Sequence, residues 1–174
     1  MPAYQRSRTH QILAIVLVVA IALLNWWLER QEQIANPAGP RDSVRVERVV
    51  DGDTLLLGPD GTRARLQGID TPETVKEDSP VEPWGPEATQ FTRDFVRAAG
   101  NRVEIEVDGE RQDQYGRRLV FVWAGERLLN EELVRAGLAR PKLAYDYSQA
   151  KKDRLKQAQR EAQAARRGIW SGKN

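Results

Sequence analysis

Three short apolar runs separated by turn signals lie between residues 43 and 68, and they constrain the fold of this chain most strongly. The first run alternates through Val44 and Val46, and "DGD" at residues 51–53 ends it. A second run at 54–57 and a third at 62–68 flank the turn signal "PDG". Because period-two alternation is typical of half-buried strands, this stretch predicts a three-stranded meander.

A helix and two more strands are predicted after the meander. The segment "GPEATQFTRDFVRAAG" (85–100) has a proline at an early helical position and a glycine at its end. Residues 102–108 and 119–123 read as strands, and 128–138 and 148–167 read as helices. Five short strands without a regular alternation of strand and helix favour a closed barrel. We therefore predict an α+β fold, mainly a five-stranded β barrel of the oligonucleotide-binding (OB) type, with about three helices.

The N-terminal region contains the apolar segment "ILAIVLVVAIALLNWWL" (12–28), which is close to the length that crosses a bilayer core. Three interpretations compete: a transmembrane signal anchor, a cleaved signal peptide and a buried core helix. The segment has no polar face, and its small residues lie inside the apolar run, so the anchor is favoured. Arginines before it orient residues 1–11 toward the cytosol, and 29–42 reads as a linker. We expect residues 43–174 to form one monomeric domain on the outer side of the cytoplasmic membrane, or to be secreted if the anchor is cleaved.

Composition restricts the chemistry only weakly. The 174 residues carry 27 Lys and Arg against 25 Asp and Glu, so a net charge of +2 gives little indication of an anionic partner. The chain has no cysteine, which excludes disulfides and cysteine-bound zinc. A binding site for an anion must therefore come from local clustering of charges.

Charged residues gather at the ends of the predicted meander strands. "DGDT" places two carboxylates around a glycine, "IDTPE" offers two more, and an arginine lies five residues before the second motif: Asp51, Asp53, Arg65, Asp70 and Glu73. Oxygen ligands without clustered His or Cys favour calcium or magnesium over zinc. Each fragment alone is more often a turn than a metal site, and Asp51 and Asp53 share a face only if the chain between them stays extended.

Six segments in the same order resemble the staphylococcal nuclease (thermonuclease) family over residues 44–171. They are "VVDGDTLLL", "RARLQGIDTPE", "WGPEATQFTRDFV", "DQYGRRLVFVW", "LNEELVRAGLAR" and "GIWS". The resemblance implies a calcium-dependent phosphodiesterase acting on DNA and RNA. It implies calcium ligands at Asp53, Asp70 and the carbonyl of Thr71. It also implies catalytic roles for Arg65, Glu73 and Arg117.

These implied roles fit the chemistry of phosphodiester hydrolysis. Negative charge grows on the phosphate oxygens in the transition state, so arginines and calcium fixed around them stabilise it. Glu73 would orient or deprotonate the attacking water. The family's nucleotide pocket is lined by tyrosines that match Tyr115, Tyr145 and Tyr147, although rings at a barrel mouth also pack structurally.

The sequence departs from the family's pattern at two places. The family's lysine before "YGR" is Gln114 here, and the loop 76–82 is acidic rather than lysine-rich. The basic helix at 148–167 either recruits nucleic acid or is a solvated face that docks Leu155 and Ile169. The alternatives to an enzyme are a non-catalytic OB-fold nucleic-acid-binding module and an anchored scaffold.

Overall fold

The computed structural model describes residues 11, 14–25, 40–74 and 82–172 of the chain, which divides into two units, Met1–Pro37 and Ala38–Asn174. In the first unit, residues 14–25 are helical and exposed. No helix within the described ranges has both the length and the apolar character needed to cross a membrane. Parts of the predicted segments 1–11, 12–28 and 29–42 lie outside the described residues, so the anchor stays a prediction.

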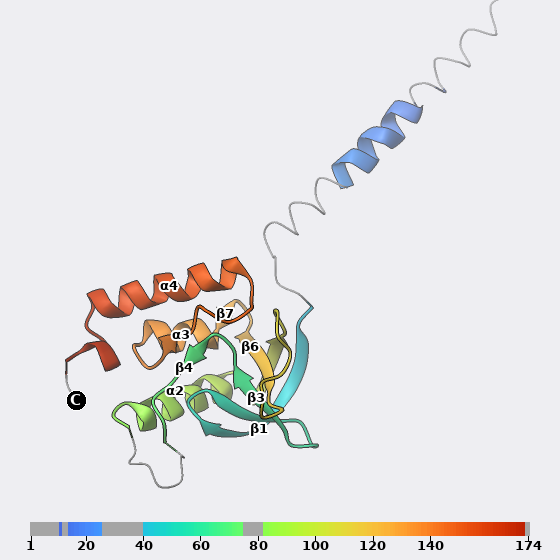
Figure 1. Cartoon of the computed structure of the whole chain (residues 1–174). Helices are drawn as coiled ribbons and strands as arrows, with labels where there is room; N and C mark the ends of the chain where they lie inside the picture. The colour runs from blue at the N-terminus through green and yellow to red at the C-terminus, as the bar shows by residue number, and fades with distance from the viewer. Residues whose placement is uncertain (1–10, 12–13, 26–39, 75–81, 173–174) are drawn as a thin grey trace, which may run out of the picture. The chain divides into compact units, whose positions relative to one another are not determined.

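The second unit is built on a closed five-stranded barrel (Figure 1). Its strands are β1 (Asp42–Asp51), β2 (Thr54–Leu57), β3 (Thr62–Leu66), β5 (Arg102–Glu106) and β6 (Arg118–Ala124). Strands β1 to β3 form an antiparallel meander, and β5 pairs with both β1 and β6. Parallel pairing of β3 with β6 closes the barrel. The predicted five-stranded barrel is therefore confirmed.

Three helices and several short elements surround the barrel. The helices are α2 (Gly85–Ala98), α3 (Leu129–Arg135) and α4 (Gln149–Ala164), and a 3-10 turn, η1 (Gly168–Trp170), follows them. A separate antiparallel pair is formed by β4 (Ile69–Asp70) and β8 (Arg140–Pro141), and β7 (Arg127–Leu128) pairs antiparallel with the end of β6. The helices fall within the predicted ranges. The two-residue strands are too short to produce an alternating pattern, so the sequence does not predict them.

The barrel strands carry the hydrophobic core, whose fully buried side chains include Leu55, Leu66, Ile105 and Val120. Strand β6 is buried on both faces, because Phe121 packs against Tyr147 on its other side. Helix α2 covers one side of the barrel through Phe95 and Val96, which lie on one face of the helix.

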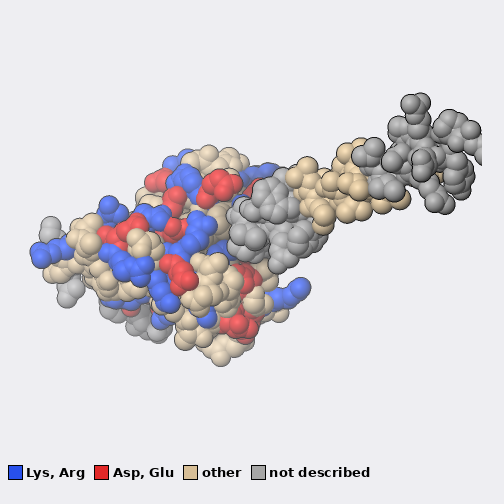
Figure 2. Space-filling view, turned by 90° about the horizontal axis from the view of Figure 1, so that it is seen from above, with Lys and Arg blue, Asp and Glu red and all other residues tan. Residues whose placement is uncertain are grey.

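Helix α4 carries most of the basic residues near the C-terminus. Leu155, on the inner face of this helix, is completely buried, and Ile169 after the helix is half-buried. Basic and acidic side chains are interspersed on the molecular face seen from above in Figure 2, and α4 contributes the pairs Arg154–Glu131 and Lys156–Asp153. These observations favour a docking helix over a basic recruiting surface.

One predicted solvated residue of α4 lies inside the protein instead. The Lys151 ammonium is 2.8 Å from the Glu106 carboxylate, and both side chains are almost completely buried. The indole N–H of Trp123 donates to the other oxygen of Glu106 at 2.8 Å. The expectation that Lys151 belongs to a solvated face is wrong, because Glu106 on β5 offers it a buried partner of opposite charge.

Candidate active site

The "DGD" segment forms the tight turn between β1 and β2. Asp51 pairs with Thr54 across the turn, and the Asp51 carboxylate accepts a hydrogen bond from the Asp53 backbone N–H at 3.0 Å. A Cβ at Gly52 would lie 2.8 Å from the Ala88 side chain and 2.9 Å from the Thr71 hydroxyl. Only glycine therefore lets this turn pack between α2 and the following loop.

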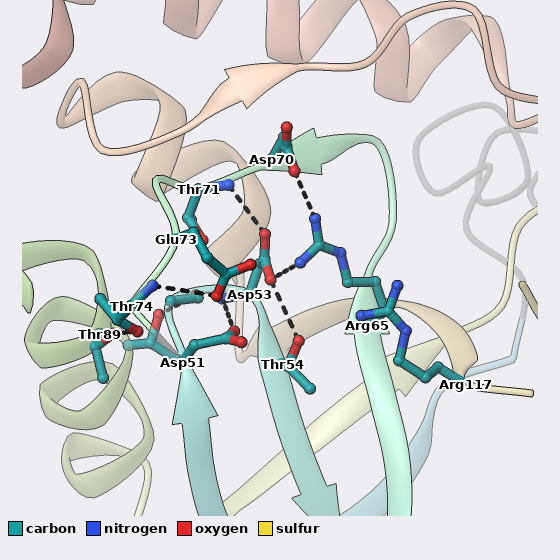
Figure 3. A network of polar contacts seen from close by, with 12 residues as sticks. Asp51, Asp53, Thr54, Arg65, Asp70, Thr71, Glu73, Thr74, Thr89 and Arg117 are labelled. Carbon is teal, nitrogen blue, oxygen red and sulfur yellow. Dashed lines mark hydrogen bonds and ion pairs between the residues drawn. The ribbon is translucent and has the colours of Figure 1, made fainter. Parts of the chain in front are cut away.

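The turn separates the roles of the two aspartates. Asp51 stabilises the turn, and burial raises the pKa of its carboxyl despite hydrogen bonding from Thr54 and the charge of Arg65. Asp53 is only 1% exposed, and its carboxylate points toward Arg65 and Thr71 (Figure 3). The first aspartate shapes the backbone, and the second presents charge to the site.

Arg65 joins the two carboxylates that the sequence assigns to a metal. Its guanidinium donates to the carboxylate of Asp53 and, at 2.7 Å, to that of Asp70. The second oxygen of Asp53 accepts the backbone N–H of Thr71 at 2.9 Å. Register explains the meeting, because Arg65 pairs with Thr54 across the hairpin and β4 begins three residues after β3 ends. The structure thus brings all four residues together at one barrel end (Figure 3).

Glu73 lies in the segment that leads from β4 to α2. Its carboxylate accepts the Thr74 backbone N–H at 3.1 Å, and its own backbone N–H donates to the Glu82 carboxylate at 3.1 Å. Figure 3 shows the Glu73 side chain on the same side as Asp51 and Asp53. A Cβ at Gly85 would lie 2.6 Å from Thr74, so the start of α2 packs tightly against this segment. The helix therefore fixes the backbone that carries the carboxylate.

Arg117 lies next to Arg65 at the other side of the site (Figure 3). Asp113 orients it by accepting its side-chain Nε–H at 2.6 Å and its backbone N–H at 3.0 Å. Burial lowers the pKa of Arg65, and the like charge of Arg117 acts in the same direction, while Asp70 opposes both. Two arginines held side by side in partial burial make a place where an anion is stabilised.

A pocket of about 400 Å³ opens beside these arginines. Its lining includes Arg65, Asp70, Arg117, Tyr115 and Tyr145. Tyr115 and Tyr145 are 74% and 54% exposed as residues, so a ligand can reach them. The Arg117 guanidinium lies 5.5 Å from the centre of the Tyr115 ring. Cations and accessible rings at one pocket suit a phosphate attached to a flat base.

Tyr147 does not line this pocket. It is 5% exposed, its ring packs 5.5 Å from that of Phe121, and its hydroxyl donates to the Lys142 carbonyl at 3.0 Å. Burial, aided by the charge of Asp108, raises the pKa of Tyr147 to about 12. The burial of Tyr147 does not fit the expected substrate contact, because the chain turns between 142 and 148 and the ring packs in the core.

The oxygen atoms at this barrel end fit a hard divalent cation. Asp53 and Asp70 bind different terminal nitrogens of the same Arg65 guanidinium, so both carboxylates already face a positive charge. The described residues contain no group of three His, Cys, Asp or Glu side chains able to hold a metal by themselves. A cation here would take two carboxylates and the Thr71 carbonyl, with the remaining positions left for water and substrate.

Comparison with known proteins identifies the family of this chain. Residues 63–172 match the family described as "Staphylococcal nuclease homologue". The chain belongs to the staphylococcal nuclease family. It is 38% identical to a thermonuclease of Staphylococcus hyicus over 163 residues, which cover 90% of this chain and 95% of the relative. A thermonuclease of Staphylococcus intermedius is 39% identical over 167 residues, covering 90% and 94%.

A third relative is an SPbeta prophage-derived endonuclease, YokF, of Bacillus subtilis (strain 168). It is 35% identical over 131 residues, which cover 74% of this chain and 44% of the relative. Membership of the staphylococcal nuclease family confirms the predicted family and the general enzyme class, a nuclease. The individual roles of Arg65, Glu73 and Arg117 stay predictions that rest on their positions.

Two polar residues of this family member contribute to the site without any signal in the sequence. Asp113 orients Arg117, and Lys142 pairs with the second oxygen of Asp70 at 3.0 Å. Asp113 sits four residues before its partner, a spacing that many solvated pairs share. Lys142 lies 72 positions after Asp70, and only the pairing of β4 with β8 brings the two together.

Proposed function

We propose that this member of the staphylococcal nuclease family is a calcium-dependent phosphodiesterase that hydrolyses DNA and RNA. The observation that supports this most directly is the placement of Arg65 and Arg117 side by side at a pocket bordered by Asp70. Each arginine is oriented by a carboxylate, Asp53 or Asp113. A phosphodiester placed between the guanidinium groups would relieve their mutual repulsion and their desolvation.

The arginines would act more strongly on the transition state than on the substrate. Attack on phosphorus builds charge on the non-bridging oxygens, and planar guanidinium forks match the geometry of those oxygens. The described bonds of Arg65 use one N–H of each terminal nitrogen, and a guanidinium has five donors, so donors remain for phosphate. Arg117 would steady the leaving oxygen by hydrogen bonding, since its very high pKa makes it a poor proton donor.

Glu73 would receive or orient the proton of the attacking water. Its carboxylate lies on the side of the site that faces Asp51 and Asp53, across from the arginines (Figure 3). This separation is suitable for a water on one side of the phosphorus and a leaving oxygen on the other. Calcium held by Asp53, Asp70 and the Thr71 carbonyl would add positive charge next to the phosphate oxygens.

We further propose that the domain acts outside the cytoplasmic membrane. The support is the apolar composition of residues 12–28, with Arg6 and Arg8 before the segment. When the full chain is expressed in a bacterium, it should fractionate with membranes and be digested by protease added to spheroplasts. A protease-resistant chain in intact spheroplasts would contradict this location.

An assay with the full chain in mild detergent tests the enzymatic proposal. The chain is incubated with single-stranded DNA, duplex DNA and RNA, with calcium or with chelator, and binding is recorded alongside cleavage. We expect calcium-dependent cleavage of all three, faster on unpaired strands because a duplex must open to place a nucleotide in the pocket. Binding without cleavage under every condition would indicate a non-catalytic module. Neither binding nor cleavage would indicate a scaffold.

A further inference from the structure

Lys142 lines this pocket together with Arg65 and Arg117. It lies directly after β8, and its ammonium is 3.0 Å from the Asp70 carboxylate. Its backbone is fixed from two directions: the N–H donates to the Gly68 carbonyl at 2.8 Å, and its carbonyl accepts the Tyr147 hydroxyl at 3.0 Å. The side chain therefore leaves a rigid backbone and points to the same edge as Asp70.

The charges of the pocket explain why this cation matters. Three basic and three acidic side chains line it: Arg65, Arg117, Lys142, Asp70, Glu110 and Asp113. Arg65 is bound to two carboxylates and Arg117 to Asp113. Without Lys142, and with no metal ion bound, the lining would carry three acidic side chains against two basic ones, which disfavours a polynucleotide.

The ion pair of Lys142 can open at little cost. The side chains of Lys142 and Asp70 are 45% and 44% exposed. Exposed pairs of this kind contribute roughly 0–1 kcal/mol, so exchanging a carboxylate for a phosphate is nearly neutral. An ammonium is also a compact charge with three donors on a flexible stem, which suits a phosphate whose position varies with the strand.

We propose that Lys142 binds the phosphate next to the scissile one in a bound strand. The site at Arg65 and Arg117 would hold the scissile phosphate, and Lys142 lines the same pocket beside Tyr145. Successive phosphates of one strand lie several ångströms apart, so two separate cation groups at one pocket suit two neighbouring phosphates. In this arrangement Lys142 makes the pocket select polynucleotides over single nucleotides.

This inference rests on the proposed function and is tested separately from it by binding. The affinity of the full chain for a single-stranded octanucleotide is measured by fluorescence anisotropy in chelator over a range of salt concentrations. Lys142→Ala should weaken binding roughly three- to tenfold and reduce the slope of log K against log salt by about 0.7, the share of one phosphate contact. Lys142→Arg should restore most of both quantities, because the charge is kept.

Lys156→Ala is the matched control. Lys156 is 42% exposed and pairs with Asp153 at 3.5 Å, which resembles the setting of Lys142, but it lies on α4 outside the pocket. Its replacement should change neither the affinity nor the salt slope. Thermal unfolding of each variant shows that the fold is retained.

Hydrolysis kinetics then separate substrate binding from a purely structural role. On the octanucleotide, Lys142→Ala should raise KM roughly three- to tenfold, and on a dinucleoside monophosphate, which has one phosphate, the effect on KM should be far smaller. An equal loss of kcat on both substrates with an unchanged salt slope would overturn the proposal and assign Lys142 to positioning Asp70. Binding by the wild-type chain without cleavage would contradict the proposed hydrolysis alone. Absence of octanucleotide binding would overturn both.

Discussion

Arg65 binds Asp53 across the β2–β3 hairpin, and the Asp53 side chain is almost completely shielded from solvent. The same guanidinium also donates to Asp70 and lines the pocket, so Arg65 both neutralises a buried carboxylate and faces the space for a ligand. Removing one partner of a buried ion pair leaves an uncompensated charge, which is costly to the fold. In the proposed mechanism, stability and catalysis are therefore coupled at Arg65.

Replacing Arg65 by lysine should lower kcat for DNA cleavage by roughly 10²-fold or more, because an ammonium cannot present two parallel N–H groups to phosphate. Arg65→Met should in addition lower the free energy of unfolding in urea by about 3 kcal/mol, because Asp53 loses its cation. Arg63→Lys, at an exposed position of the same strand, is the control. Normal kcat in Arg65→Lys would exclude a fork-shaped contact with phosphate.

Asp113→Asn should lower kcat roughly tenfold by freeing the Arg117 side chain from its fixed orientation. Burial alone would raise the pKa of Asp113, but hydrogen bonds from Arg117 and Tyr115 outweigh it and lower the pKa. If Asp113 acts only through Arg117, the double variant with Arg117→Ala is no slower than Arg117→Ala alone. Additive losses would give Asp113 a separate role, and Asp94→Asn, at an exposed position of α2, serves as the control.

Lys151→Met should destabilise the chain by about 3–5 kcal/mol in urea denaturation, because Glu106 would keep a buried charge without its ammonium partner. Adding Glu106→Gln should recover a large part of the loss, since the amide is uncharged and can still accept the Trp123 indole N–H. A double variant no more stable than Lys151→Met would show that charge burial is not the cause.

Tyr147 should make the fold sensitive to alkali. Its pKa is about 12 in the fold against an ordinary value of 10.0, so below pH 10 both states keep the proton. Between these values the unfolded state loses the proton first, and stability falls as pH rises, by up to about 2 kcal/mol. Urea denaturation from pH 9 to 11.5 should show this decline in the wild type. The decline should be shallower in Tyr147→Phe, and parallel curves would contradict the assignment.

The barrel could be predicted because its strands have a recognisable sequence pattern. Alternating valines and leucines and the glycine turns of the meander define β1 to β3, and each strand end then carries its charge to one edge. Arg65 and Asp70 meet for this reason. Tyr147 was harder to place, because a spacing of two from Tyr145 implies a shared face only in a strand, and the chain turns there.

Contacts that depend on tertiary packing could not be predicted from the spacing of residues in the sequence. Lys151 repeats the spacing of solvated lysines on α4, and only the position of Glu106 on a neighbouring strand makes it a buried ion. Lys142 reaches Asp70 through a ladder of two residues on each side, too short to leave a periodic trace. Such partners become visible only when the chain is folded in three dimensions.

The most direct test of the account is the calcium-dependent rate of single-stranded DNA cleavage by the full chain carrying Glu73→Gln. Removing a general base should lower kcat by roughly 10²- to 10⁴-fold, while octanucleotide affinity in chelator changes little. Glu87→Gln, at an exposed position of α2, should cleave at the wild-type rate. Cleavage by Glu73→Gln at the wild-type rate, or wild-type cleavage that persists in chelator, would contradict a hydrolytic site built from Glu73, the two arginines and a calcium ion.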